Sequence, residues 1–228
     1  MEIHRKGIEN LHVGVYPPDG KVRVATPLHL DDEAVRLAVV SRLSWIRQQR
    51  QGFARQARQS TREMVTGESH YFEGQRYRLN VVERPGNSRV RIANRNSLEL
   101  RVPPGTDQAG RKRVIDRWYR RRLKARIPDL LAQWEPIVGV SVTDCRVKRM
   151  KTRWGSCNIE TKRIWLNLEL AKKDPLCLEY ILVHEMVHLL ERHHTDRFRS
   201  LMDEFMPDWR LRRDMLNTAP LAYEDWDY

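Results

Sequence analysis

Residues 174–194 read Asp-Pro-Leu-Cys-Leu-Glu-Tyr-Ile-Leu-Val-His-Glu-Met-Val-His-Leu-Leu-Glu-Arg-His-His, and this stretch decides the fold. Asp174 suits the N-cap of a helix, and Pro175 suits its first helical position. Apolar residues lie on nearly every face of the helix over residues 181–190, which is typical of a buried helix. The sequence therefore predicts a buried helix that runs to about Glu191.

Within this helix, His184-Glu185-Met186-Val187-His188 form the pattern H-E-x-x-H. The two histidines are four residues apart on one face of the helix, so their imidazoles can bind one zinc ion. Glu185 lies beside them, where its carboxylate can take a proton from a water that the metal activates. The alternative is a pair of core histidines bonded to carbonyls. A metal with its water would satisfy all three buried polar side chains at once, and such groups are costly without partners.

A catalytic zinc site takes three protein ligands and keeps its fourth position for water. Four of the eight histidines fall within residues 184–194. His194 lies ten residues after His184, the interval between the first and third histidines in H-E-x-x-H-x-x-G-x-x-H. Glu191 occupies the place of the glycine in that pattern, and His193 is the rival third ligand. We expect one zinc ion per chain, because the sequence contains one ligand cluster.

The rest of the chain predicts a mixture of strands and helices without internal repeats. Alternating apolar residues between turn residues predict strands over 11–15, 22–24, 71–82 with a turn at Gly74, 90–102, 140–147 and 163–170. Helical spacing predicts further helices over 31–50, 107–134 with a kink or break at Pro128, and 196–206. Pro103-Pro104-Gly105 is a break in the chain. We therefore expect an α+β fold with an N-terminal hairpin, helix and strand region over residues 1–105 and a second region over 106–228, together forming one compact unit.

The composition is that of a globular protein with a heavily charged surface, since the 228 residues are 40% hydrophobic and 32% charged. Apolar stretches such as residues 137–142 are far too short to span a membrane. Residues 1–6 contain no apolar signal region, so we expect a cytoplasmic protein. The three cysteines are odd in number and scattered, which favours a reducing compartment over a disulfide scaffold.

The net charge of +12 is concentrated in short runs. Residues 111–126 contain nine basic residues and one acidic residue, Asp116. The runs 46–62 and 145–153 each contain five basic residues and no acidic one. Such runs suit a polyanion, either nucleic acid or a nucleotide, which they would bind weakly and without sequence preference. The alternative is a solvated helix face that binds nothing.

These motifs together resemble the YgjP/SprT-like zinc metallopeptidases, and specifically the YgjP-like branch. The matching segments span nearly the whole chain and are the N-terminal hairpin and helix, the hairpin at Gly74, Arg153-Trp154-Gly155-Ser156-Cys157, Ile164–Asn167, Val183–His188, and His194-Thr195 followed by Phe198. The resemblance implies a zincin-like domain with a small antiparallel sheet and the H-E-x-x-H helix beneath it. It implies His184, His188 and His194 as zinc ligands and Glu185 as the general base. The chain departs from the family at His193, where such sequences more often carry Asn.

The sequence favours a zinc metallopeptidase that cleaves peptide or protein substrates, in which Glu185 passes a proton from the attacking water to the leaving amine. One alternative keeps the metal site and makes the chain a nucleoside triphosphate pyrophosphatase. A further alternative is a nucleic-acid-associated binding protein with a structural zinc ion. Such a structural site would not need a carboxylate next to its ligands.

Four further residues are candidates for contacts with a substrate in the cleft: Arg153, Trp154, Asn167 and His193. Arg153 and Trp154 precede a glycine turn near the strand that should face the helix, and Asn167 alternates with core residues on that strand. The alternative for Arg153 and Trp154 is turn and core packing, and the alternative for Asn167 and His193 is solvent exposure. The donor that stabilises the oxyanion of the reaction is left open among Tyr180, Arg153 and His193.

Overall fold

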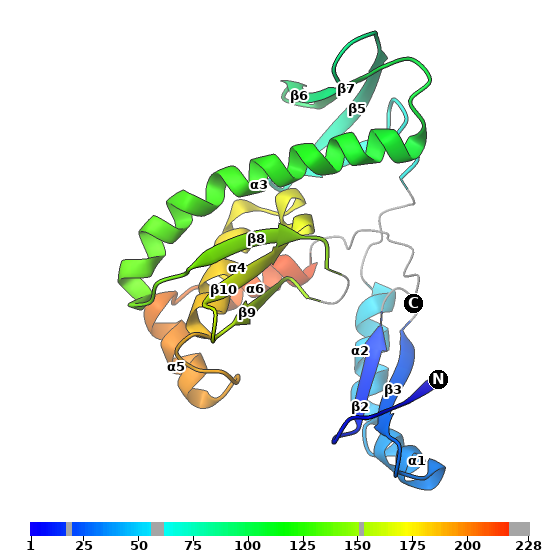
Figure 1. The fold of residues 1–228 in the computed structure, drawn as a ribbon, viewed down its shortest axis with the longest axis vertical. Helices are drawn as coiled ribbons and strands as arrows, with labels where there is room; N and C mark the ends of the chain where they lie inside the picture. Colours follow the sequence, from blue (N-terminus) through cyan, green and yellow to red (C-terminus); the bar gives the residue numbers. More distant parts are fainter. Residues whose placement is uncertain (17–19, 56–61, 151–152, 219–228) are drawn as a thin grey trace. The chain divides into compact units, whose positions relative to one another are not determined.

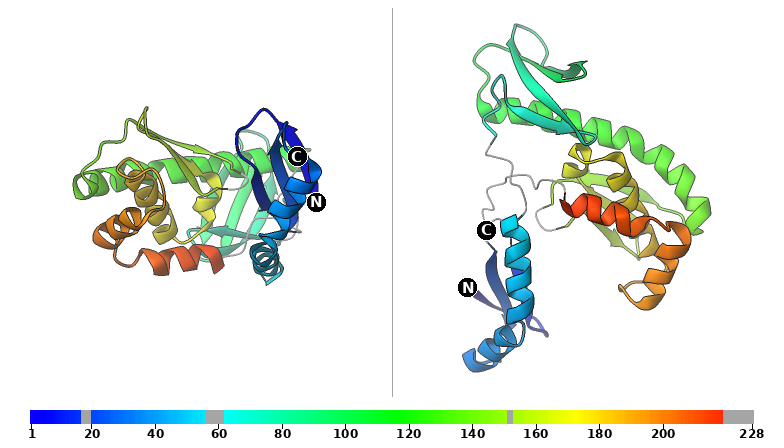
Figure 2. Two further views of the ribbon diagram at one scale, coloured as in Figure 1. Left: turned by 90° about the horizontal axis from the view of Figure 1, so that it is seen from below. Right: turned by 180° about the vertical axis from the view of Figure 1, so that it is seen from behind.

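The computed structural model describes residues 1–16, 20–55, 62–150 and 153–218 (Figures 1 and 2). The chain forms two compact units, which divide at residues 60 and 61. The second unit is the larger and contains all of the candidate site residues. No helix in the described part of the chain is both long and apolar enough to cross a membrane.

The first unit joins a three-stranded sheet, in the order β1-β3-β2, to two helices. Its elements are β1 (Glu2–Lys6), β2 (His12–Tyr16), β3 (Lys21–Pro27), α1 (Asp32–Val40) and α2 (Leu43–Arg55). β2 and β3 pair antiparallel, which confirms the predicted hairpin, and its turn at residues 17–19 lies outside the described residues. The sequence does not predict β1, which pairs parallel with β3, because a parallel pair cannot be joined by a short local turn.

The single helix predicted over residues 31–50 is wrong, because the structure has two helices there. Asp31 caps α1, and its carboxylate accepts a hydrogen bond of 2.8 Å from a backbone N–H of the first turn. The C-cap of α1 is Ser41, whose hydroxyl donates to the carbonyl of Ala38 (3.0 Å). This hydrogen bond competes with the backbone pattern of a helix, and α2 begins only at Leu43.

The second unit begins with a four-stranded sheet in the order β4-β5-β7-β6. Its strands are β4 (Ser69–Phe72), β5 (Gln75–Glu83), β6 (Arg89–Asn94) and β7 (Ser97–Val102). Gly74 makes the predicted turn between β4 and β5, with a φ of 78° that favours glycine. Tyr77, Leu79, Leu98 and Leu100 are buried on one face of the sheet, so both predicted strand regions are confirmed.

The long helix α3 (Gln108–Val138) packs against this sheet and is drawn as one continuous helix in Figure 1. Asp107 is its N-cap and accepts a hydrogen bond of 2.7 Å from a backbone N–H of the first turn. The helix continues through Pro128, so of the predicted kink or break the break does not occur. Ile127 and Trp134 are buried on either side of the proline, and their packing stabilises both halves of α3.

The four-stranded sheet of the second unit and α3 are joined by aromatic side chains. The ring centroids of Phe72 and Trp118 are 4.7 Å apart, and the hydroxyl of Tyr119 donates to the carbonyl of Tyr71 (2.7 Å). Because of this shared core, the compact units divide at residues 60 and 61, whereas the predicted boundary lies between residues 105 and 106.

The second unit also contains a three-stranded sheet in the order β8-β10-β9. Its strands are β8 (Asp144–Lys148), β9 (Gly155–Asn158) and β10 (Arg163–Asn167). β10 pairs parallel with β8 and antiparallel with β9, so this sheet is mixed and not antiparallel throughout as the resemblance implied. The strand predicted over 163–170 is too long, because the side chain of Asn167 accepts a hydrogen bond from the N–H of Glu169 (3.2 Å). That contact starts the 3₁₀ helix η1 (Leu168–Lys172).

Three helices complete the second unit: α4 (Pro175–Val187), α5 (Asp196–Phe205) and α6 (Trp209–Thr218). Asp174 caps α4 as predicted and accepts a hydrogen bond of 2.9 Å from a backbone N–H of the first turn. α4 packs against β9, β10, α3 and α6, in agreement with its apolar sequence. It ends about one turn earlier than predicted, and the sequence does not predict α6 beyond Pro207. The chain is thus a mixed α+β structure with small sheets.

Candidate active site

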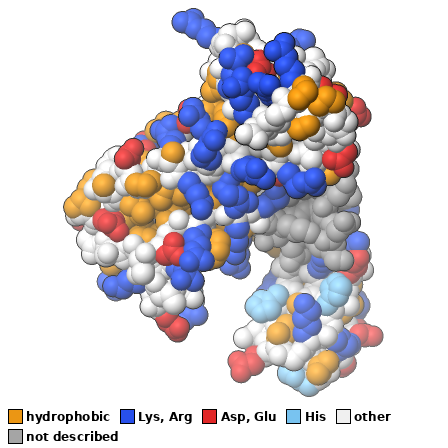
Figure 3. Space-filling view, turned by 45° about the horizontal axis from the view of Figure 1, so that its top comes forward, with side chains coloured by type: hydrophobic (Ala, Val, Ile, Leu, Met, Phe, Trp, Pro, Cys, Tyr) orange, Lys and Arg blue, Asp and Glu red, His pale blue; other side chains and the backbone are white. Residues whose placement is uncertain are grey.

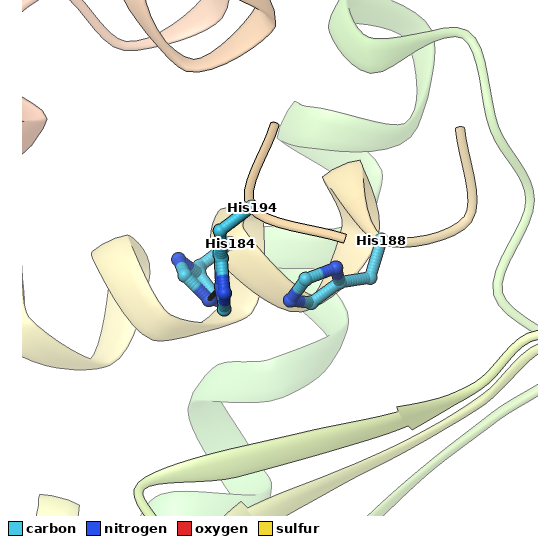
Figure 4. Close-up of side chains that lie close together, drawn as sticks. All are labelled: His184, His188 and His194. Carbon is cyan, nitrogen blue, oxygen red and sulfur yellow. Dashed lines mark hydrogen bonds between the residues drawn. The ribbon is translucent and has the colours of Figure 1, made fainter. Parts of the chain in front are cut away.

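The path of the chain after α4 brings three histidines together. His184 and Glu185 lie in the last turn of α4, and His188 is its C-cap. The backbone N–H groups of Leu189 and Leu190 donate to carbonyls three residues earlier, which makes a tight turn. The chain then enters α5 at its N-cap, Thr195. This path returns His194 to the side of α4 on which the other two histidines lie (Figure 4).

The three imidazole rings form a compact cluster. The Nε2 atoms of His184 and His194 are 3.0 Å apart, and one nitrogen of each ring lies within 4.8 Å of the others. The centroids of the three rings are separated by 4.9, 5.0 and 4.8 Å. The ring of Phe198 lies 4.9, 4.7 and 4.8 Å from those of His184, His188 and His194, so it forms an apolar wall beside the cluster.

This cluster fits a metal ion. Two nitrogens bound to one zinc at about 2.0–2.1 Å in tetrahedral geometry are about 3.3 Å apart, close to the separation of His184 and His194. Burial lowers the pKa of His184 to about 3 and also lowers the pKa of His188, so both rings are neutral, as ligands must be. The Nδ1–H of His188 donates to the carbonyl of Glu191 (3.1 Å), which leaves Nε2 available as a ligand atom. The Nε2 atom of His184 faces His194 and is the ligand atom of this ring, whereas its buried Nδ1 has no hydrogen-bond partner among the described residues.

Glu185 is buried, with 6% of its surface exposed, and its side chain lies against the backbone of Gly155 on β9. A Cβ atom at Gly155 would lie 2.5 Å from Oε1 and 2.7 Å from Cγ of Glu185, closer than such atoms approach in proteins. Glycine therefore leaves the room that the carboxylate occupies. Burial raises the pKa of Glu185 to about 8, and the positive charge of Arg153 opposes this shift.

Replacing Gly155 with Ala is expected to lower hydrolytic activity by roughly 10²-fold, because a displacement of about 1 Å at a reacting group has an effect of this size. The three atoms nearest to the added Cβ all belong to Glu185, so the carboxylate moves first and the metal should be retained. Turnover and zinc content of the purified variant check this expectation. Gly7→Ala is the matched control, since a Cβ there meets nothing within 4 Å. Full activity in Gly155→Ala would mean that the position of the carboxylate does not matter.

The histidine cluster and Glu185 line a pocket of about 1120 Å³ between β9, α4, the turn after α4, and α6. Arg153 and Trp154 are among the residues that line it. Arg192 and Arg213 line it as well, and the sequence did not indicate either. Arg213 belongs to α6, and no pattern in the sequence of this helix predicts that it packs beside α4.

The two remaining candidates lie elsewhere. Asn167 is buried and is not among the residues that line the pocket. Its side-chain amide donates to the carbonyls of Met150 and Arg153, both at 2.8 Å, so it holds the chain on which Arg153 lies. His193 is exposed, lies outside the histidine cluster, and donates from its backbone N–H to the carboxylate of Glu191 (3.3 Å).

The model of a family described as "YgjP-like, metallopeptidase domain" matches residues 11–219. No curated protein matches the chain. Among solved structures, the metallopeptidase zymogen of Pyrococcus abyssi abylysin is 22% identical over 40% of this chain and 92% of that one, with a TM-score of 0.38. The metallopeptidase zymogen of Methanocaldococcus jannaschii jannalysin is 21% identical over 40% of this chain and 95% of that one, with a TM-score of 0.33. The family match includes the histidine cluster and its pocket.

Proposed function

The chain belongs to the YgjP-like metallopeptidase family, and we propose that it cleaves peptide or protein substrates with one zinc ion held by His184, His188 and His194. We propose Glu185 as the general base. The observation that carries the proposal is that three imidazoles and one buried carboxylate converge on a single pocket.

The histidine cluster suits zinc because neutral imidazoles are ligands that zinc prefers, and three protein ligands are typical of a catalytic site. When bound, zinc lowers the pKa of a water molecule and polarises the carbonyl of the substrate. The chain itself holds the ligands in place. Helical spacing on α4 positions His184 and His188, and the capped start of α5 positions His194.

Glu185 would take the proton of the attacking water and pass it to the leaving amine. It follows His184 directly, so it points about 100° around the helix from the ligand and not along the ligand face. Burial favours the neutral form of Glu185, so the group holds a proton once it has taken one. The positive charge of Arg153 favours the ionised carboxylate that acts as the base, and a zinc ion, when bound, would add to this effect.

The exposed edge of β9 supports a peptide as the substrate. In the described sheet, β9 is an edge strand, and residues 155–158 of this strand line the pocket. An extended peptide can add to such an edge as a further strand through backbone hydrogen bonds. A peptide bound in this way would pass beside Glu185, which touches the first residue of β9.

Tyr180 is the best-placed donor for the oxyanion among the three that the sequence leaves open. It lies one turn before His184 on α4 and lines the pocket, with its ring centroid 5.8 Å from that of His184. Its ring also stacks on Trp209, with centroids 6.4 Å apart. His193 does not line the pocket, which weighs against it.

One observation favours an alternative substrate, a nucleoside triphosphate. Arg153, Arg192 and Arg213 line the pocket and could bind phosphate groups. The other alternative, a nucleic-acid-associated protein with a structural zinc ion, accounts for the histidines but not for Glu185. A structural site fills its four positions with protein ligands and needs no carboxylate beside them.

The cysteines support a reducing compartment and no catalytic role of their own. Cys145, Cys157 and Cys177 are all unpaired. Burial raises their pKa values to about 12, 11 and 11, so the thiols stay protonated and unreactive at neutral pH. Unpaired thiols of this kind suit the cytoplasm, which is the location that we propose.

An activity screen tests the proposed function. Zinc-loaded protein is incubated with casein, with a mixture of short peptides and with nucleoside triphosphates, and products are identified by mass spectrometry. We expect peptide cleavage by the wild-type protein and none by Glu185→Gln. Hydrolysis of nucleoside triphosphates without any peptide cleavage would assign the pocket to the nucleotide alternative.

A further inference from the structure

Four basic side chains follow one side of α3, away from the pocket. Arg113, Arg117, Arg121 and Lys124 are all exposed. Their spacing of four, four and three residues places them within about 80° around the helix and over roughly 17 Å along it. Figure 3 shows lysine and arginine side chains along α3 on the face that it displays. These four residues are termed the basic stripe.

The other basic residues of α3 form ion pairs, hydrogen bonds or cation–π contacts within the described part of the protein, and the four residues of the basic stripe do not. Five of the nine basic residues in 111–126 make such contacts, and these are Arg111 with Glu83, Lys112 with Asp116, Arg120 with the carbonyl of Val147, Arg122 with the ring of Phe72, and Arg126 with Glu73. The four residues of the basic stripe have no hydrogen bond or ion pair through their side chains with any described residue. The one acid within residues 111–126 is Asp116, which pairs with Lys112 and Arg149 and so leaves the charge of the stripe uncompensated.

The helix that carries the basic stripe, α3, packs beside β8 of the three-stranded sheet β8-β10-β9. On the adjacent side of α3, Arg120 and Asp116 bond to the two residues that flank Lys148 on β8, at 2.5 and 2.8 Å. Lys148 is exposed, and its ammonium lies 4.6 Å from the ring centroid of Trp165 on β10. The guanidinium of Arg146 lies 5.7 Å from the same ring. A half-buried indole with two cations therefore lies on the sheet next to the stripe.

We propose that the basic stripe, Lys148 and Trp165 form a binding surface for single-stranded nucleic acid. Cations repeated along a helix suit a run of phosphates, and roughly 17 Å matches about five nucleotides at an axial rise of about 3.4 Å. The ring of Trp165 is partly exposed, and an unpaired base would stack on it as the flexible Lys148 side chain leaves the ring face for a phosphate. Duplex nucleic acid and anionic membranes would satisfy the charge but would leave the indole without a role. The surface shares no residue with the histidine cluster, so this proposal is independent of the proposed peptidase activity.

The first experiment measures how the full chain binds a labelled single strand of about 20 nucleotides as salt rises from about 50 to about 200 mM. The stripe variant replaces all four stripe residues with Gln, which is a good helix former. It is expected to bind at least about tenfold more weakly at the lower salt concentration. The slope of log K against log salt should fall by about 3, at about 0.7 for each lost phosphate contact.

A charge-matched control replaces four exposed arginines on or next to β5 and β6 with Gln, namely Arg76, Arg78, Arg84 and Arg89. It removes the same charge from the protein and is expected to keep the wild-type slope. Thermal unfolding checks that both variants are folded. If the control loses as much affinity as the stripe variant, binding depends on net charge alone and the proposed surface is wrong.

Trp165→Ala distinguishes a single strand from other polyanions. It is expected to weaken binding of the single strand about tenfold and to leave binding of the duplex of the same sequence unchanged. Lys148→Gln keeps the indole and should lower the salt slope by about 0.7, which preserves the test if Trp165→Ala does not fold. Equal loss on single strand and duplex, or binding to phosphatidylserine vesicles but not to either oligonucleotide, would overturn the proposal.

Discussion

A Glu185→Gln protein is expected to lose about 10²–10⁴-fold in peptide hydrolysis while it keeps its fold and its zinc ion. Gln has nearly the size of Glu and remains polar, so the space beside Gly155 can hold it. The amide cannot accept the proton of the attacking water, and this is the role proposed for the carboxylate. Zinc should be retained, because Glu185 is not one of the three clustered ligands. Turnover, elemental analysis and thermal unfolding of the same sample provide the three readouts.

The matched control for this variant is Glu204→Gln, which removes one carboxylate from the exposed surface of α5. It should leave turnover and zinc content unchanged. Normal turnover by a folded, zinc-loaded Glu185→Gln protein would reject the proposed base. Loss of zinc from that variant would make Glu185 a ligand or a structural partner of the site.

Zinc binding should depend on His194 and not on His193. His194→Ala removes the ring whose Nε2 lies 3.0 Å from that of His184. The loss of affinity should exceed the roughly 10–100-fold that follows when a ligand loses a hydrogen-bonding partner. Zinc content of the purified protein should fall from about one equivalent to a small fraction, as it should for His184→Ala and His188→Ala.

His193→Ala is the matched control for this series, since its ring is exposed and lies outside the cluster. It should keep its zinc and its turnover. If His193→Ala loses zinc while His194→Ala retains it, the chain leaves α4 by a different turn and the third ligand is His193.

Local signals in the sequence were sufficient for the elements that carry the ligands. Asp174 and Pro175 fixed the start of α4, and the four-residue spacing then placed His184 and His188 on one face. The two hairpins were equally local, because their turn residues lie between alternating apolar strands. The parallel pairs, β1 with β3 and β8 with β10, were not predictable in this way, because no short turn links their strands.

The rest of the candidate site depends on contacts between distant segments. The sequence left His193 and His194 as alternatives, and only the turn after α4 brings His194 to the cluster. Gly155 was visible as part of a motif, but its close approach to Glu185 depends on how β9 packs on α4. Asn167 is itself buried at the end of β10, and its amide donates to the carbonyl of Arg153 instead of reaching the pocket. Such roles depend on tertiary packing, which overrides patterns along the chain.

The most direct test of the proposed function is cleavage of a single peptide by the full chain before and after its zinc is removed. Protein treated with a chelator should be inactive, and about one equivalent of zinc should restore cleavage at the same peptide bond. Glu185→Gln should stay inactive after the same treatment. Cleavage by the metal-free protein, or no peptide cleavage after zinc has been restored to one equivalent, would contradict the account.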